Sequence, residues 1–159
     1  MPLSRDAAFA QFKHTLDSQG VRESLRFLVE LTDYRFISIF RFADGRAKSV
    51  VHVDRFDDNQ VQTDEVADTA TYCCYVRDSA GPFITADAMS DPRTAEHPAR
   101  QAIRAYCGMP VFTPEGVLIG TLCHYDTEPR DPGQIDIELM LRVSSALAYG
   151  NFVPNYPVA

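Results

Sequence analysis

The sequence lacks any run of five or more basic residues, and its 15 Lys and Arg are outnumbered by 22 Asp and Glu. The formal net charge of −7 repels the phosphate backbone of nucleic acids and anionic lipid surfaces. No stretch is long and apolar enough to cross a bilayer, and the first residues lack the apolar core of a secretion signal. The sequence therefore predicts a cytoplasmic location, with no nucleic-acid partner and no membrane partner.

The motifs of several kinds of site are also missing. There is no Gly-x-Ser-x-Gly stretch of the kind that presents a hydrolase nucleophile, and the glycines match no phosphate-binding loop. The four cysteines lack the close spacings of structural zinc sites, so we expect reduced thiols and no metal. We assign no catalytic residue, and the sequence favours binding over catalysis. The cysteines are Cys73, Cys74, Cys107 and Cys123.

The residues that are present predict one domain with a large core. The 159 residues contain no composition shift and no linker-like tract, so a single domain over 1–159 is expected. Hydrophobic residues make up 45% of the chain and include ten Phe and seven Tyr. Such a chain can bury enough apolar surface to fold without disulfides or a structural metal.

Apolar residues recur at intervals of three and four near both ends of the chain, which is typical of amphipathic helices. This spacing predicts N-terminal helices within 1–32, divided at Gly20, and a C-terminal helix over 131–149. Asp131 and Pro132 are the residue types that open a first helical turn.

From Tyr34 the spacing of apolar residues changes to two, as in strands whose side chains alternate between two faces. Sheet and pocket elements are therefore expected over 34–126. Strands are predicted over 34–42, 46–55, 82–85, 106–112 and 117–125, and short helices over 69–76 and 98–105, with a surface loop over 87–98. Strands joined mostly by turns, with helices at the chain ends, predict an α+β domain.

Three segments together carry a resemblance. They are Thr71-Tyr72-Cys73, then Gly81 to Ala88 running on to Asp91-Pro92-Arg93, and finally Gly108 to Val111 followed by Gly116 to Cys123. In order and spacing they resemble the GAF domains of bacterial signalling proteins, most strongly between residues 69 and 147.

The resemblance implies a profilin-like, three-layer arrangement. A central antiparallel sheet of five or six strands would carry the terminal helices on one face and a ligand pocket on the other. It implies a small-molecule-binding sensor in a signalling pathway, with an unknown ligand or cofactor. No kinase, cyclase or DNA-binding segment is evident in the chain, so we expect a stand-alone domain that signals to a separate effector protein. The apolar stripes of the terminal helices predict a homodimer.

The resemblance also places candidate ligand-binding residues around the pocket. Arg93 and Arg100 suit a carboxylate or phosphate, which favours a small anionic ligand. A solvated loop in which Asp91 and Arg93 pair with each other is the competing interpretation. His124 is either a core histidine bonded to backbone or part of a cavity, and His52 is expected at the surface. The candidates are Phe40, Tyr72, Cys73, Asp87, Asp91, Arg93, His97, Arg100 and His124.

Two other functions remain open at this level. One is a thiol-dependent enzyme that resembles free methionine sulfoxide reductase, since Cys73 or Cys74 lies near the position of one cysteine of that enzyme. The other is an interaction or dimerisation module that binds no ligand.

Overall fold

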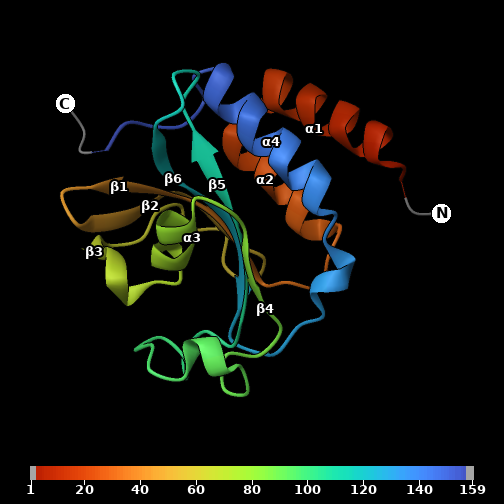
Figure 1. The fold of residues 1–159 in the computed structure, drawn as a ribbon. Coiled ribbons are helices and arrows are strands. Elements are labelled where there is room, and N and C mark those ends of the chain that lie inside the picture. The colour runs from red at the N-terminus through yellow and green to blue at the C-terminus, as the bar shows by residue number, and fades with distance from the viewer. Residues whose placement is uncertain (1–2, 157–159) are drawn as a thin grey trace.

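The computed structural model describes residues 3–156, so both ends of the domain expected over 1–159 lie outside the described residues. One antiparallel sheet of six strands runs through the molecule in the order β3-β2-β1-β6-β5-β4 (Figure 1). The strands are β1 Phe36–Ala43, β2 Arg46–Asp54, β3 Val66–Ala67, β4 Phe83–Thr85, β5 Ala105–Phe112 and β6 Leu118–Asp126.

Helices cover both faces of this sheet (Figure 1). Helices α1 (Arg5–Gln19), α2 (Val21–Glu30) and α4 (Ile137–Tyr149) pack together on one face, and the short α3 (Cys73–Ser79) lies on the other. The predicted α+β arrangement, with terminal helices on one face, is confirmed. Among the helices of residues 3–156, none has both the length and the apolar character that crossing a membrane requires.

The alternation of side chains along the central strands divides the core into two parts. Ile37 and Ile39 of β1 join Leu122 of β6 in the cluster beneath the helices. Phe40 and Cys123 are each one position further along these strands, so their side chains point to the other face of the sheet. There they join a second cluster beneath α3. Each fully buried side chain of this size stabilises the fold by about 1.5–3 kcal/mol, so the register of the strands is strongly fixed.

Two β-bulges set the twist of the central strands. In β2, Val51 pairs with Ile39 and Ser49 with Phe40, so Val50 is the extra residue. In β6 the register shifts near Gly120, where a Cβ atom would stand 1.9 Å from the carbonyl oxygen of Phe40. A glycine is required at position 120 because the backbone of β1 approaches it closely.

Three predicted helices need correction. The helix expected over 98–105 is wrong: residues 98–102 form turns, and β5 begins at Ala105 because Arg104 N–H already donates to the Asp126 carbonyl. The helix expected over 69–76 is interrupted at Thr71, whose extended backbone separates a 3₁₀ turn, Asp68–Ala70, from α3. At the C-terminus, Asp131 caps a separate 3₁₀ turn, Pro132–Gln134, and Asp136 caps α4.

His52 was expected at the surface, and this prediction is wrong because its side chain is only 3% exposed. Its Nδ1 lies 2.6 Å from Ser38 Oγ and 3.2 Å from the Tyr125 hydroxyl. Burial lowers the pKa of His52, and His124 is buried on the helix side of the sheet with a pKa lowered by burial to about 4. Both histidines are therefore neutral at pH 7.

The close approach at Gly120 predicts that Gly120→Ala lowers the free energy of unfolding by about 2–4 kcal/mol, because backbone atoms must move to admit the methyl group. The matched control is Gly81→Ala, whose added Cβ would meet nothing nearer than 3.9 Å, and which should stay within about 1 kcal/mol of wild type. Urea unfolding measures both variants. Equal stabilities for the two variants would contradict the β1–β6 geometry.

The neutral histidines predict a loss of stability in mild acid. An unfolded histidine binds a proton below pH 6.5, whereas folded His124 does so only near pH 4. The unfolded state therefore binds more protons in this window, and the free energy of unfolding falls with decreasing pH by about 1.4 kcal/mol per unit for each such group. His124→Phe should flatten the curve between pH 6.5 and 5. A curve for His124→Phe parallel to that of wild type would disprove the assignment.

Candidate functional site

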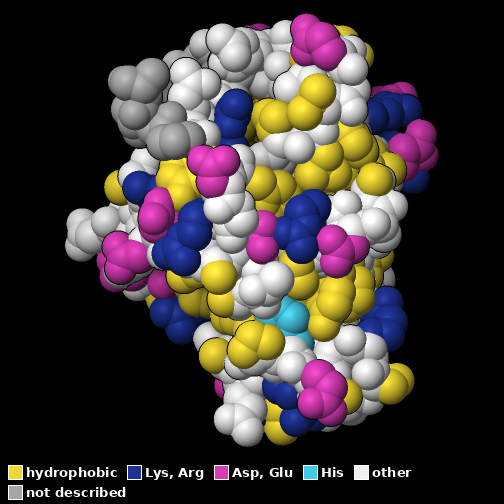
Figure 2. Space-filling model, turned by 60° about the vertical axis from the view of Figure 1, so that its left-hand side comes forward, with side chains coloured by type: hydrophobic (Ala, Val, Ile, Leu, Met, Phe, Trp, Pro, Cys, Tyr) yellow, Lys and Arg dark blue, Asp and Glu magenta, His cyan; other side chains and the backbone are white. Residues whose placement is uncertain are grey.

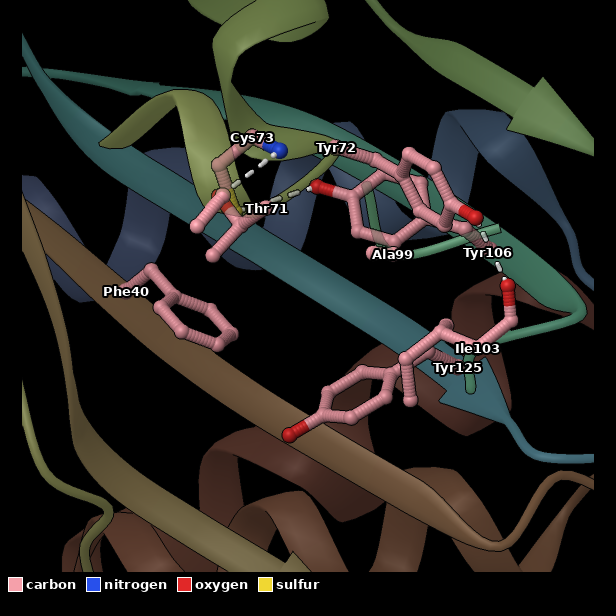
Figure 3. Close-up of a pocket in the computed structure, with 9 residues that line it drawn as sticks. Phe40, Thr71, Tyr72, Cys73, Ala99, Ile103, Tyr106 and Tyr125 are labelled. Carbon is pink, nitrogen blue, oxygen red and sulfur yellow. Dashed lines mark hydrogen bonds between the residues drawn. The ribbon is translucent and has the colours of Figure 1, made fainter. Parts of the chain in front are cut away.

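A small cavity lies between the sheet and α3, on the face opposite the terminal helices. Its volume is about 80 Å³. The sheet supplies its floor and the segments around α3 supply its roof, so that the Phe40 and Tyr125 rings face Thr71 and Cys73 (Figure 3). The lining residues are Phe40, Ala70, Thr71, Tyr72, Cys73, Ala99, Ile103, Tyr106 and Tyr125.

The floor of the cavity depends on the alternation along the strands. Three rings form this floor, and all of them lie on the face of the sheet that is turned away from the terminal helices. They are Phe40 of β1, Tyr106 of β5 and Tyr125 of β6. The Tyr106 ring lies along its own strand over Gly108, and a side chain at position 108 would collide with it. A Cβ atom there would stand 2.3 Å from the Tyr106 hydroxyl. Gly108, which the sequence shows as part of a family segment, therefore shapes the floor.

The roof is tied together by hydrogen bonds. The Thr71 hydroxyl accepts from the Cys73 N–H at 3.2 Å, which orders the start of α3. The Tyr72 hydroxyl donates to the Ile103 carbonyl at 2.7 Å and joins α3 to the turns over 98–102 (Figure 3). Two lining segments that lie some 30 residues apart in the sequence are thus held at a fixed separation.

His97 does not line the cavity, but it holds two residues that do. Its Nδ1 accepts from the Ala99 N–H at 3.0 Å, so in the neutral ring Nε2 carries the proton and donates to the Thr71 carbonyl at 3.0 Å. The imidazole also packs on Tyr72, with ring centroids 4.5 Å apart. Burial lowers the pKa of His97, although its bond to Thr71 opposes this, and the neutral form is the one that makes both bonds.

Cys73 brings a thiol to the cavity wall. Its Sγ lies 3.1 Å from Thr121 Oγ1 and accepts from the Tyr106 hydroxyl at 3.4 Å. Burial alone would raise the pKa of Cys73, but hydrogen bonds from Cys123 and its other neighbours hold it below its usual value. Burial raises the pKa of Cys123, so this thiol keeps its proton.

The other two cysteines lie away from the cavity. Cys107 packs in the core beneath the helices, and Cys74 contacts His97 at 3.9 Å. All four thiols are buried and unbridged.

The charged candidate residues lie outside the cavity. They are Asp87, Asp91 and Arg93 in the loop over 87–98, and Arg100 after it. Asp87 receives two hydrogen bonds from Arg104, at 2.6 and 2.8 Å. Asp91 pairs with Arg93 at 2.7 Å, and this guanidinium holds the pKa of Asp91 well below its usual range. Arg100 donates to the Met89 carbonyl at 3.1 Å. The competing interpretation, in which Asp91 and Arg93 pair with each other, matches this geometry.

The structure therefore brings together Phe40, Tyr72 and Cys73 and places His97 directly behind them. It places His124 on the opposite face of the sheet, against Tyr34. The sequence analysis did not identify Tyr106 and Tyr125 as site residues. Both lie on the same face of the sheet as Phe40, so the alternation of side chains along the strands could have identified them. The remaining lining residues lie in connecting segments where apolar residues have no regular spacing, so no pattern marks them. They are Ala70, Thr71, Ala99 and Ile103.

The chemistry of the cavity is mostly apolar. None of its nine lining residues is acidic or basic, and its polar groups are hydroxyls, backbone and the Cys73 thiol, whose pKa is lowered to about 7. Within residues 3–156, no group of three or more His, Cys, Asp or Glu side chains is placed to hold a metal ion. On the outer surface, Figure 2 shows acidic and basic side chains interspersed with apolar ones, without a broad basic patch on that face.

Comparison with curated proteins gives one partial relative. A segment of 65 residues, 39% of this chain, is 43% identical to a cyclic di-GMP phosphodiesterase of Pseudomonas aeruginosa. The match spans only 11% of that protein's length.

Solved structures share the fold at low sequence identity. The GAF domain of an Acinetobacter phosphoenolpyruvate-protein phosphotransferase matches with a TM-score of 0.74 at 11% identity, over 93% of this chain and 92% of that one. Free methionine-R-sulfoxide reductase of Neisseria meningitidis, solved with its substrate, matches with a TM-score of 0.64 at 13% identity, over 88% and 81% of the two chains. A family model described as GAF domain matches residues 19–149, most of the chain, and the chain therefore belongs to the GAF domain family.

Proposed function

We propose that this domain is a small-molecule sensor of a signalling pathway, and that its ligand binds in the cavity between α3 and the sheet. The observation that carries the proposal is the cavity itself, which is lined mainly by aromatic and aliphatic side chains from five separate segments. Apolar walls with a few hydroxyls are typical of small-molecule sites. A solved protein of the same fold, the reductase of Neisseria meningitidis, was captured with its substrate.

The cavity favours a ligand different from the anion that Arg93 and Arg100 suggested. Neither arginine lines the cavity, and the charge of Arg93 is already neutralised by Asp91. An uncharged ligand loses less hydration energy than an anion on entering such a space. The volume of about 80 Å³ is far below the roughly 300–1,000 Å³ of sites for drug-sized molecules. We therefore infer an uncharged ligand of a few heavy atoms, unless the roof moves outward.

A larger ligand would have to displace the turns over 98–102. That movement breaks the bond from Tyr72 to Ile103 and the bond from His97 to the Thr71 carbonyl. Both bonds fix the position of these turns relative to the start of α3, so their loss would transmit occupancy to the surface of the domain. We infer that an effector protein reads this surface. The relative that is a cyclic di-GMP phosphodiesterase suggests that the effector is an enzyme of cyclic-dinucleotide signalling.

The terminal helices suit a homodimer contact. Leu141 of α4 is 38% exposed and Tyr149 is 68% exposed, and both border a groove that reaches Phe9 of α1. Glu138 and Arg142 also line this groove. Burial of its apolar side chains against a second copy would remove them from water.

The cavity predicts that Ala70→Leu, which adds bulk at its exposed rim, weakens ligand binding at least 10-fold because the new side chain occupies the site. Ala102→Leu is the matched control, since Ala102 is exposed in the neighbouring turns and does not line the cavity. Thermal unfolding with a panel of uncharged and anionic metabolites measures binding, since a ligand at 100 times its Kd stabilises by about 2.7 kcal/mol. A ligand that binds both variants equally, or no ligand for the wild type, would contradict the proposal.

The dimer contact predicts that Leu141→Glu converts the protein to monomers, because it replaces an exposed apolar side chain of the groove with a second carboxylate near Glu138. Val61→Glu serves as the control, since Val61 is 49% exposed in the loop after β2 and lies far from α4 in the sequence. Multi-angle light scattering at micromolar concentration gives the mass of each. A wild-type protein that is monomeric under these conditions would rule out the contact.

A further inference from the structure

A second and larger cavity lies on the helix side of the sheet. Its volume is about 230 Å³, and it forms where the start of α1, the end of α2 and the start of α4 meet over β6 (Figure 1). Leu28, Leu139 and Met140 are buried in its walls. Leu3 and Leu31, which are 51% and 43% exposed, also line it, so the cavity communicates with the surface. The sheet separates it from the cavity beneath α3.

The wall of this cavity contains a buried imidazole, His124, of which one nitrogen has no hydrogen-bond partner among the described residues. His124 is 1% exposed, and a backbone hydrogen bond with Leu28 partly opposes the effect of burial on its pKa. Its Nε2 meets no hydrogen-bond partner of good geometry in the range 3–156. The hydroxyl of Tyr34, whose ring centroid is 5.7 Å from that of His124, has no partner in this range either. A buried polar group left unpaired costs about 1–3 kcal/mol, and folded proteins contain few of them. A polar guest in the cavity would remove part of this cost.

The charges at the rim do not favour an ionic guest. Arg5 donates to both carboxylate oxygens of Asp136, at 3.1 and 2.9 Å, and it also pairs with Glu138. Its charge is thus already neutralised. Burial keeps His124 neutral at pH 7, since it lowers the pKa of this group to about 4. A nitrogen of a neutral imidazole either donates or accepts one hydrogen bond, and a hydroxyl group can pair with it in both cases.

From this geometry we propose that the helix-side cavity is a second binding site, for a small uncharged molecule that has an apolar body and one hydroxyl group directed at His124. The size of the cavity agrees with a substituted ring, because an apolar cavity of about 150 Å³ is enough to bind benzene. The site is formed by residues of α1, α2 and α4. Its ligand would therefore stabilise the packing of these helices on each other and on β6.

Phenol and toluene are the probes that test this site, because they share a ring and differ in the hydroxyl group. We expect wild-type protein to bind phenol at least 10-fold more tightly than toluene, and to show a change in the ¹⁵N shift of His124 Nε2 with phenol alone. In His124→Phe the preference for phenol should fall below about twofold, since the replacement ring offers no polar atom. Titration followed by NMR gives both the affinities and the shifts.

Two further readouts keep the test independent of the folding of that variant. Nuclear Overhauser contacts in wild-type protein should join phenol to the methyl groups of Leu28 and Leu139, and Ala70→Leu, which alters the other cavity, should leave phenol binding unchanged. The proposal is overturned if phenol contacts Thr71 or Tyr125 instead, or if Ala70→Leu abolishes binding. It is also overturned if phenol and toluene bind alike, or if neither binds at millimolar concentration, in which case an ordered water alone satisfies His124.

Discussion

The alternation of side chains along β1, β5 and β6 is the constraint on which the rest of the structure depends. The middle parts of these strands are buried on both faces, so their buried apolar residues belong either to the core beneath the helices or to the core beneath α3. A slip of one residue would exchange the two sets and expose neither to water, yet it would destroy the packing of both. The bulges in β2 and β6 and the contact between Gly120 and Phe40 fix the register against such a slip.

The cavity beneath α3 follows from this register together with two ties in its roof. The register directs three aromatic rings of the sheet to one side, and Gly108 lets one of them lie flat. His97 and Tyr72 then hold the roof at a short distance above these rings. The loop over 87–98 thus acts on the cavity through His97, which stands behind its wall. Asp87 of this loop pairs with Arg104, and Asp91 pairs with Arg93.

How far the sequence predicts this site depends on how local each signal is. The five predicted strands and the helix break at Gly20 follow from short-range patterns, and all are present. The helix expected over 98–105 fails because pairing with β6, a long-range interaction, draws Arg104 and Ala105 into the sheet. His52 is buried for a similar reason, since its partners Ser38 and Tyr125 come from two other strands.

Xenon provides the most direct test of the central claim, that an open apolar cavity persists between α3 and the sheet. Crystals pressurised with xenon should show a bound atom in contact with Phe40 and Tyr125, because xenon occupies dry apolar cavities of this kind. Diffraction that instead shows the Tyr72 or Tyr106 ring filling that space, with no xenon near Phe40, would contradict the account.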